Sequence, residues 1–165
     1  LEEWPRIVRT SRRPGDRLRL LFVGGEFERK GGPSLLRVFA ARFQGLAELD
    51  IVSDTAPPDV PPSVRVHRGL RPNAPELKAL YRAADALIHP TTADLSGWVV
   101  LEAGACSCPA VVTATGGVPE LVEDGRTGFV VPVGDDRRLG DAIERLVSDR
   151  SAAAGRRSAV PAGHR

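Results

Sequence analysis

The sequence predicts an α/β domain in which a doubly wound parallel sheet is covered by helices on both faces. Short apolar segments alternate along the chain with longer stretches that have helical periodicity. The apolar segments are continuous rather than alternating, which is typical of parallel strands buried on both faces. At 165 residues without an internal repeat, the chain has the size of one domain. Together these features indicate a Rossmann-like fold.

The apolar segments predict six strands, in chain order at 18–24, 49–53, 64–67, 86–90, 110–113 and 129–132. The periodic stretches predict four helices, at 33–43, 74–84, 97–105 and 136–148. Pro33 and Pro75 fall where the first turn of a helix tolerates proline, and Asp135 is a suitable N-cap for the last helix. The segment TAPPDVPPS, residues 55–63, is expected to be a structural loop.

Three parts are expected along the chain. Residues 1–17 contain arginines and prolines without an apolar pattern and are expected to be a linker. Residues 18–150 form the predicted domain, and residues 151–165 are expected to be a disordered tail. The chain begins with Leu1 and contains no methionine, so we expect a fragment of a longer protein.

The composition excludes several classes of protein. Hydrophobic residues make up 42% and charged residues 27%, and the net charge of +2 is too small to indicate nucleic-acid binding. No apolar run approaches the roughly 18 residues of a membrane span, and no secretory signal opens the chain. Cys106 and Cys108 are too close for an unstrained disulfide, and no second pair completes a zinc site. We expect buried free thiols in a cytoplasmic protein.

Three loops follow the first, fourth and fifth strands, at 23–32, 89–98 and 113–120, and should share one edge of the sheet. The first is glycine-rich and contains Lys30, a point charge that suits a phosphate. It is not a Walker loop, because Gly31 follows the lysine, and the dinucleotide fingerprint is absent. For this loop, a plain turn and an anion site explain the sequence equally well. The same two alternatives apply to TGGVPE, residues 115–120.

The stretch DLSGWVVLE places Asp94 in a loop and Glu102 within the following helix, with seven uncharged residues between them. Ionised carboxylates only accept hydrogen bonds, which suits neighbouring sugar hydroxyls. Free N–H groups around Gly97 and Trp98, at the helix start, would favour a phosphate. One segment thus offers the groups that a nucleotide sugar needs. A solvated Asp94 and a Glu102 paired with an arginine remain the structural alternative.

From Leu18 to about Asp149 the chain resembles the C-terminal, donor-binding half of retaining family 4 glycosyltransferases, which have the GT-B fold. The resemblance is carried, in family order, by FVGGEFERKGG, LKALYRAADALIHPT, SGWVVLEAGACSCPAVVTATGGVPELVEDGRTGFVVPVGD and AIERLV. It implies that Asp94 holds hydroxyls of the transferred sugar and Glu102 the ribose hydroxyls. It also implies that Lys30 neutralises the diphosphate leaving group, which makes Lys30 and Asp94 the expected catalytic residues.

The resemblance further implies a set of donor-binding positions grouped in the loops. Backbone groups meet the sugar and diphosphate at Ser96, Gly97 and Trp98, a loop borders the diphosphate at Gly116 and Gly117, and a turn holds the base at Arg68, Gly69 and Leu70. Gly24 and Gly25, in the first loop, are further donor-binding positions. The chain departs from the family pattern at four positions. Asp94 is shorter than the usual glutamate, Gly25 replaces an arginine, and Leu95 and Ser96 replace glycine and phenylalanine. Arg29 is the candidate to supply the charge missing at Gly25.

These observations predict the donor half of an enzyme that transfers a sugar from a nucleoside diphosphate sugar with retention of configuration. The acceptor, a saccharide, lipid or small molecule, would bind an N-terminal domain that this chain lacks. No cofactor, obligatory metal, nucleic acid or membrane span is expected, although the full-length enzyme could lie on the inner membrane face. The alternatives are a non-catalytic nucleotide-sugar-binding or regulatory domain and a generic nucleotide-binding module. His67, His89 and His164 are not expected to be catalytic, because the first two end strands and the third lies in the tail.

Overall fold

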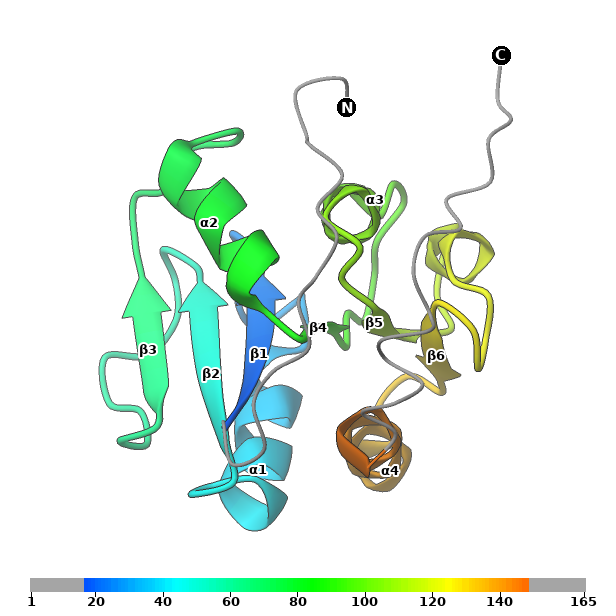
Figure 1. Cartoon of the computed structure of the whole chain (residues 1–165), viewed down its shortest axis with the longest axis horizontal. Coiled ribbons are helices and arrows are strands. Elements are labelled where there is room, and N and C mark those ends of the chain that lie inside the picture. The colour runs from blue at the N-terminus through cyan, green and yellow to red at the C-terminus, as the bar shows by residue number, and fades with distance from the viewer. Residues whose placement is uncertain (1–16, 149–165) are drawn as a thin grey trace.

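The computed structural model describes residues 17–148, which form a six-stranded sheet between two layers of helices (Figure 1). All neighbouring strands pair in parallel, in the order β3-β2-β1-β4-β5-β6. This confirms the predicted doubly wound α/β fold. The expected tail, and the expected linker apart from Arg17, lie outside the described residues.

All six strands and four helices occur where the sequence predicts them, within two residues at either end. The strands are β1 (Leu18–Val23), β2 (Ala47–Val52), β3 (Val64–His67), β4 (Ala86–His89), β5 (Ala110–Thr113) and β6 (Gly128–Val131). The helices are α1 (Gly32–Arg42), α2 (Pro75–Ala83), α3 (Trp98–Ala105) and α4 (Asp136–Ser148), with a short 3₁₀ helix, η1 (Val118–Leu121), between β5 and β6.

The local signals that define the helix ends are confirmed. Pro33 and Pro75 lie in the first turns of α1 and α2. The Asp135 carboxylate accepts a hydrogen bond from the Arg138 backbone N–H at 2.9 Å, which caps the first turn of α4. Cys106 and Cys108 are buried free thiols, as expected, in the core beneath α3.

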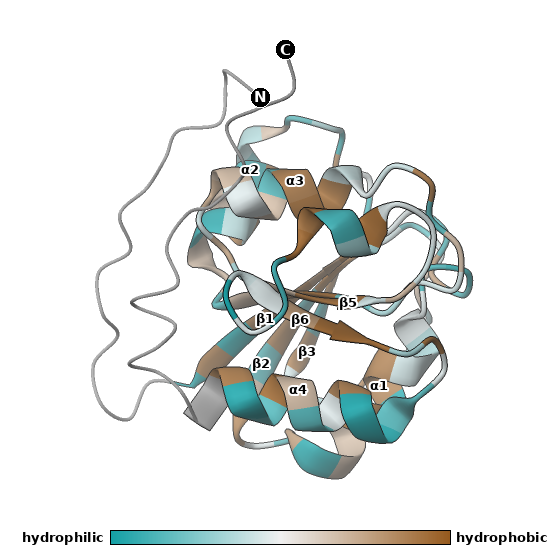
Figure 2. Ribbon diagram, turned by 90° about the vertical axis from the view of Figure 1, so that its right-hand side faces the viewer, coloured by the Kyte–Doolittle hydropathy of each residue, from teal (hydrophilic) through white to brown (hydrophobic). Residues whose placement is uncertain are grey.

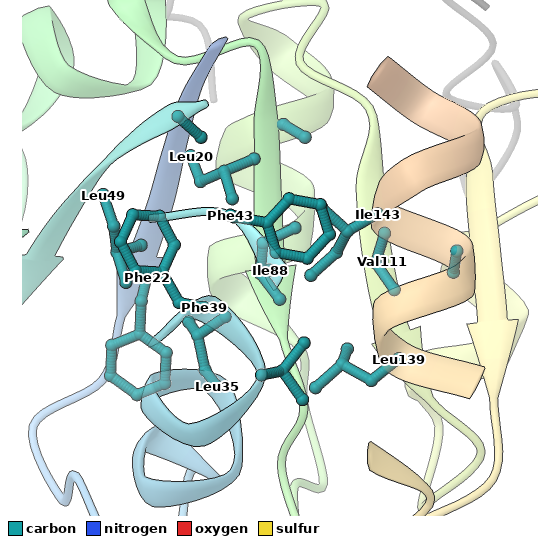
Figure 3. Close-up of a cluster of buried hydrophobic side chains, with 14 of the residues drawn as sticks. Leu20, Phe22, Leu35, Phe39, Phe43, Leu49, Ile88, Val111, Leu139 and Ile143 are labelled. Carbon is teal, nitrogen blue, oxygen red and sulfur yellow. The ribbon is translucent and has the colours of Figure 1, made fainter. Parts of the chain in front are cut away.

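Each face of the sheet has its own apolar core. Helices α1 and α4 cover one face and α2 and α3 the other, each turning its hydrophobic side inward (Figure 2). Beneath α1 and α4, the ten labelled side chains of Figure 3 pack together: Leu20, Phe22, Leu35, Phe39, Phe43, Leu49, Ile88, Val111, Leu139 and Ile143. Burial on both faces explains why the strands are continuously apolar in sequence.

The connections between strands and helices reverse direction at the centre of the sheet. β1 and β4 are neighbours, yet β1 leads into α1 on one face and β4 into α3 on the other. The chain therefore leaves the two strands in opposite directions at their carboxyl ends. In open α/β sheets, this point of reversal is where ligands bind.

Gly31 allows the β1–α1 loop to approach the end of β4 closely. Its φ of +80° lies in the left-handed region, and a Cβ atom there would lie 1.9 Å from the Pro90 carbonyl oxygen. Such a distance is impossible without movement of backbone. The close approach of the two loops thus depends on the absence of a side chain at this position.

A comparison of Gly31→Ala with Gly45→Ala should distinguish two causes of lost stability: a left-handed backbone conformation and the steric contact with Pro90. Gly45 has a similar φ of +84° but nothing within 4 Å of its would-be Cβ. We expect Gly45→Ala to lower the free energy of unfolding by about 1–2 kcal/mol, the cost of a left-handed alanine. Gly31→Ala should lower it by roughly 1–3 kcal/mol more, because the loops must separate. Equal losses in urea unfolding would show that the contact with Pro90 is unimportant.

Candidate functional site

The loops after β1 and β4 are joined by hydrogen bonds at the carboxyl ends of these two strands. The backbone N–H of Thr92 donates to the Arg29 carbonyl oxygen at 3.1 Å, and the Thr92 hydroxyl donates to the same oxygen at 2.9 Å. These bonds hold the loop that carries Lys30 against the loop that carries Asp94. The prediction that both loops share one edge of the sheet is confirmed.

Asp94 lies at the centre of this site, with 7% of its side chain exposed. Its Oδ2 atom accepts hydrogen bonds from Lys30 Nζ at 2.6 Å and from His89 Nε2 at 2.7 Å. Its Oδ1 atom accepts bonds from the backbone N–H groups of Ser96 and Gly97, at 3.2 and 3.1 Å. The two expected catalytic residues are therefore in direct contact, although 64 positions separate them in sequence.

The hydrogen bonds keep Asp94 ionised. Burial alone would raise the pKa of this carboxyl group, but the bonds from Lys30, Gly97, His89 and Ser96 outweigh burial and lower it. The lysine and the amides at the start of α3 were expected to face a diphosphate. These groups donate hydrogen bonds to the carboxylate of Asp94, so this helix start contacts a negatively charged group.

His89 belongs to the site, although its position at a strand end was interpreted as structural. Its side chain is completely buried, and burial lowers its pKa despite the opposing effect of the hydrogen bond to Asp94. Nδ1 has no hydrogen-bond partner among residues 17–148. The neutral ring with the proton on Nε2 suits these surroundings, because protonation would leave a buried N–H at Nδ1 unsatisfied.

Arg29, the candidate to supply the charge missing at Gly25, makes its hydrogen bonds within the two loops beside Asp94. Its guanidinium binds the Glu26 carboxylate at 2.7 and 2.8 Å and the Ala93 carbonyl oxygen at 2.8 Å. The hydrogen bond from Arg29 lowers the pKa of Glu26. Arg29 therefore braces the loop, and Lys30 is the cation directed at Asp94.

The third loop closes the same edge, as predicted. Gly116 has a φ of +54°, and a Cβ atom there would lie 2.0 Å from the Asp94 carbonyl oxygen. At Gly117 the corresponding distance to the Leu95 carbonyl oxygen is 3.4 Å. On the β1 side, a Cβ at Gly24 would lie 2.9 Å from Cβ of Lys30, whereas Gly25 is open. At Gly116 and Gly117 the backbone of the third loop thus approaches the backbone of residues 94 and 95.

Glu102 lies apart from the Asp94 contacts, because its carboxylate turns to helix α2. Its Oε2 atom accepts a hydrogen bond from the Tyr81 hydroxyl at 2.7 Å. Burial raises the pKa of Glu102, and the bond from Tyr81 opposes this rise. The arginine partner considered as an alternative is not what the described structure shows, since the partner of Glu102 is a tyrosine. Tyr81 was not identified from the sequence.

The turn expected to hold the base lies at the end of β3. The Arg68 guanidinium donates to the carbonyl oxygens of Asp54 and Ala56, at 2.7 and 2.6 Å, and the Gly69 N–H donates to Asp54 Oδ1 at 2.6 Å. The Arg68 side chain therefore fastens this turn to the loop after β2. Leu70 packs against the core beneath α2 and α3.

Two large apolar side chains lie exposed beside the buried centre of the site. Leu95 is 93% exposed, and Trp98, in the first turn of α3, is 62% exposed. Within residues 17–148 no cluster of three potential metal ligands occurs. The same stretch contains no helix with the length and apolar character needed to cross a bilayer.

Residues 1–149 match the sequence profile of the family described as Glycosyl transferases group 1. A D-inositol 3-phosphate glycosyltransferase of Arthrobacter sp. is 31% identical over 153 residues, which cover 82% of this chain and 36% of the relative. The corresponding protein of Pseudarthrobacter chlorophenolicus is 36% identical over 140 residues, or 84% of this chain and 29% of the relative. The chain thus spans about a third of the length of these relatives.

Solved structures show the same fold. The lipopolysaccharide glycosyltransferase WaaG superposes with a TM-score of 0.74 and 25% identity, over 86% of this chain and 42% of that protein. Anabaena HepE in complex with UDP-glucose gives a TM-score of 0.73 with 21% identity, over 86% of this chain and 42% of HepE. At this identity the match to HepE establishes the fold alone.

Asp94→Asn should change the acid dependence of stability. Because the pKa of Asp94 is lower in the folded chain than in the unfolded chain, its stabilisation is complete above about pH 5 and is lost as pH falls below roughly 4. Asp94→Asn should lower the free energy of unfolding at pH 7 by about 2 kcal/mol. The free energy of unfolding of this variant should also fall less steeply than that of wild type as the pH is lowered. Urea unfolding from pH 7 to 3 measures both effects.

Asp59→Asn, which removes an exposed carboxylate, controls for the change in net charge. If wild type and Asp94→Asn lose stability in parallel as pH falls, the hydrogen bonds to Asp94 do not stabilise its charged form.

Proposed function

The chain belongs to the glycosyl transferases group 1 family, and we propose that it forms the C-terminal, donor-binding half of a retaining family 4 glycosyltransferase. The observation that carries the proposal is the Lys30–Asp94 contact of 2.6 Å at the point where the sheet reverses direction. A lysine, a carboxylate and the first amides of a helix meet there. A phosphorylated sugar can use all three groups, with its phosphate on the lysine and the amides and its hydroxyls on the carboxylate.

In the proposed reaction, the bond between the sugar's anomeric carbon and the diphosphate oxygen breaks, and the diphosphate departs with the electron pair. The anomeric carbon bonds to the acceptor's hydroxyl oxygen on the same face, and that hydroxyl passes its proton to the departing diphosphate. Negative charge grows on the departing diphosphate. Lys30 stabilises this charge because its ammonium group has three N–H donors, of which Asp94 takes one. No metal ion is required in this proposal.

Asp94 has a second task when the donor is bound. Its carboxylate is held ionised in a fixed orientation by four hydrogen bonds, so it can accept from sugar hydroxyls without reorganising first. The donor's phosphate must then compete with Asp94 for Lys30 and for the amides of Ser96 and Gly97. We propose that these groups are shared between the sugar and the diphosphate.

We assign the nucleoside to Glu102 in α3 and to the turn that follows β3. Glu102 would accept from the ribose hydroxyls, and the backbone of the turn at Gly69 and Leu70 would border the base. Arg68 contributes by holding this turn to the β2–β3 loop. The acceptor would be bound mainly outside this chain, and the D-inositol 3-phosphate glycosyltransferases suggest a polyol or its phosphate as one class to test.

A non-catalytic sugar-nucleotide-binding domain is the less favoured function. It was motivated by the short Asp94 and by Gly25 in place of an arginine. Asp94 nevertheless reaches Lys30 and His89, so the shorter side chain does not abolish the cluster. Support for the enzyme is therefore stronger than support for the alternative.

Lys30→Ala and Glu102→Ala should be separable by what each residue contacts. In calorimetry with UDP or GDP and the matching nucleosides, we expect Glu102→Ala to weaken nucleoside and diphosphate alike, by about tenfold or more. Lys30→Ala should weaken only the diphosphate, and its effect should shrink at high salt because the contact is partly exposed. For the wild type, the free energy of binding a nucleoside diphosphate should be roughly −4 to −6 kcal/mol, which corresponds to a Kd in the millimolar to high micromolar range.

Arg126→Ala is a matched control for the loss of one positive charge. The Arg126 side chain is 70% exposed and lies before the amino end of β6, whereas Lys30 follows the carboxyl end of β1. It should leave every affinity unchanged. If folded Lys30→Ala loses nucleoside and diphosphate equally, Lys30 is not the phosphate residue. If wild type binds no nucleoside diphosphate at millimolar concentration, the proposed function is wrong.

A further inference from the structure

The buried hydroxyl of Tyr81 contacts one acid of the site from a separate helix. Tyr81 lies in α2 with no exposed surface, and its hydroxyl donates to Oε2 of Glu102 in α3 at 2.7 Å. Burial and the neighbouring carboxylate raise the pKa of the phenol well above its ordinary value. The phenol therefore keeps its proton, and Glu102 is always the acceptor in this bond.

This bond fixes one end of the Glu102 carboxylate and leaves the other end available. Glu102 is half-buried, and within residues 17–148 its Oε1 atom has no hydrogen-bond partner. A glutamate in a helix has three side-chain torsions, and a fixed Oε2 removes most of their freedom. The second oxygen is then presented in a defined direction, which is the condition for accepting from a pair of vicinal hydroxyls.

A purely structural role for the pair explains the geometry less well. The bond does connect α2 to α3, but a neutral acceptor would do this without the cost of burying a carboxylate, a cost visible in the raised pKa of Glu102. A retained half-buried charge with one open oxygen is typical of a binding group.

We propose that Tyr81 is a positioning residue for ligand binding: it holds Glu102 in the orientation that receives the ribose. This inference rests on the proposed function of Glu102. Tyr81 does not touch the nucleotide and acts only through the carboxylate. Its hydrogen bond also opposes the rise in the pKa of Glu102 that burial causes.

Tyr81 faces Glu102 from α2, and Cys106 and Cys108, which follow the end of α3, act on Tyr81. Removal of the phenol hydroxyl should therefore raise the pKa of Glu102 further. Nucleotide binding needs the ionised acid, so the pH at which binding reaches half its maximum should move upward.

The test compares wild type, Tyr81→Phe and Glu102→Gln, with UDP and inorganic pyrophosphate as probes between pH 5 and 8. Tyr81→Phe keeps the ring and its packing. We expect it to weaken UDP at pH 7 by about two- to tenfold, the effect of one hydrogen bond, and to leave pyrophosphate unchanged. The UDP profile should shift to higher pH. In Glu102→Gln residue 102 cannot titrate, so the pH dependence that remains comes from the ionisation of UDP and of other groups. This profile is the baseline against which the shift is measured.

A second measurement does not depend on a ligand. The chain contains one tyrosine, so tyrosine labelled with ¹³C at Cζ gives one resonance from a residue in contact with Glu102. In wild type this resonance should move with pH as Glu102 titrates, and Glu102→Gln should abolish the movement. Addition of UDP at constant pH should also shift it.

The outcomes separate the two proposals. If wild type binds UDP but Tyr81→Phe binds it with the same affinity and the same pH profile, Tyr81 does not position Glu102, and the proposed function stands. If the tyrosine resonance does not follow Glu102, the inference is also wrong. If wild type fails to bind UDP or any other nucleoside diphosphate, both proposals fail together.

Discussion

The site depends on one buried carboxylate that cannot be left without partners. Asp94 is almost fully covered, and an ionised acid in such a place needs hydrogen bonds to be stable. The loop after β1 supplies Lys30, the end of β4 supplies His89, and the start of α3 supplies two amides. The three segments are thereby held at one point. The glycines nearby, Gly31 and Gly116, are needed because they let the backbones come that close.

The two acids of the DLSGWVVLE segment are given opposite environments by the fold. Asp94 is surrounded by donors, which lower its pKa, whereas Glu102 has one donor and a pKa raised by burial. Both are in position to accept hydrogen bonds, but only Asp94 is neutralised by a lysine. This difference supports the assignment of Asp94 and Lys30 to the charged part of a donor and Glu102 to its uncharged ribose.

Much of this architecture could be predicted from the sequence, because the strands are buried on both faces and the helices on one. That pattern fixes the order of elements, and a parallel sheet then brings the loops of residues 23–32, 89–98 and 113–120 to one edge. Side-chain partners were predicted less well. Arg29 binds Glu26, a contact that their spacing of three residues allows but does not require. His89 and Tyr81 contact the acids through tertiary packing, for which a single sequence carries no direct signal.

The most direct test of the account is a crystal structure of the chain with UDP. We expect the diphosphate within hydrogen-bond distance of Lys30 Nζ and the ribose hydroxyls on Oε1 of Glu102, with the hydrogen bond from Tyr81 to Oε2 intact. UDP bound away from the carboxyl ends of β1 and β4, with Lys30 still directed only at Asp94, would contradict it.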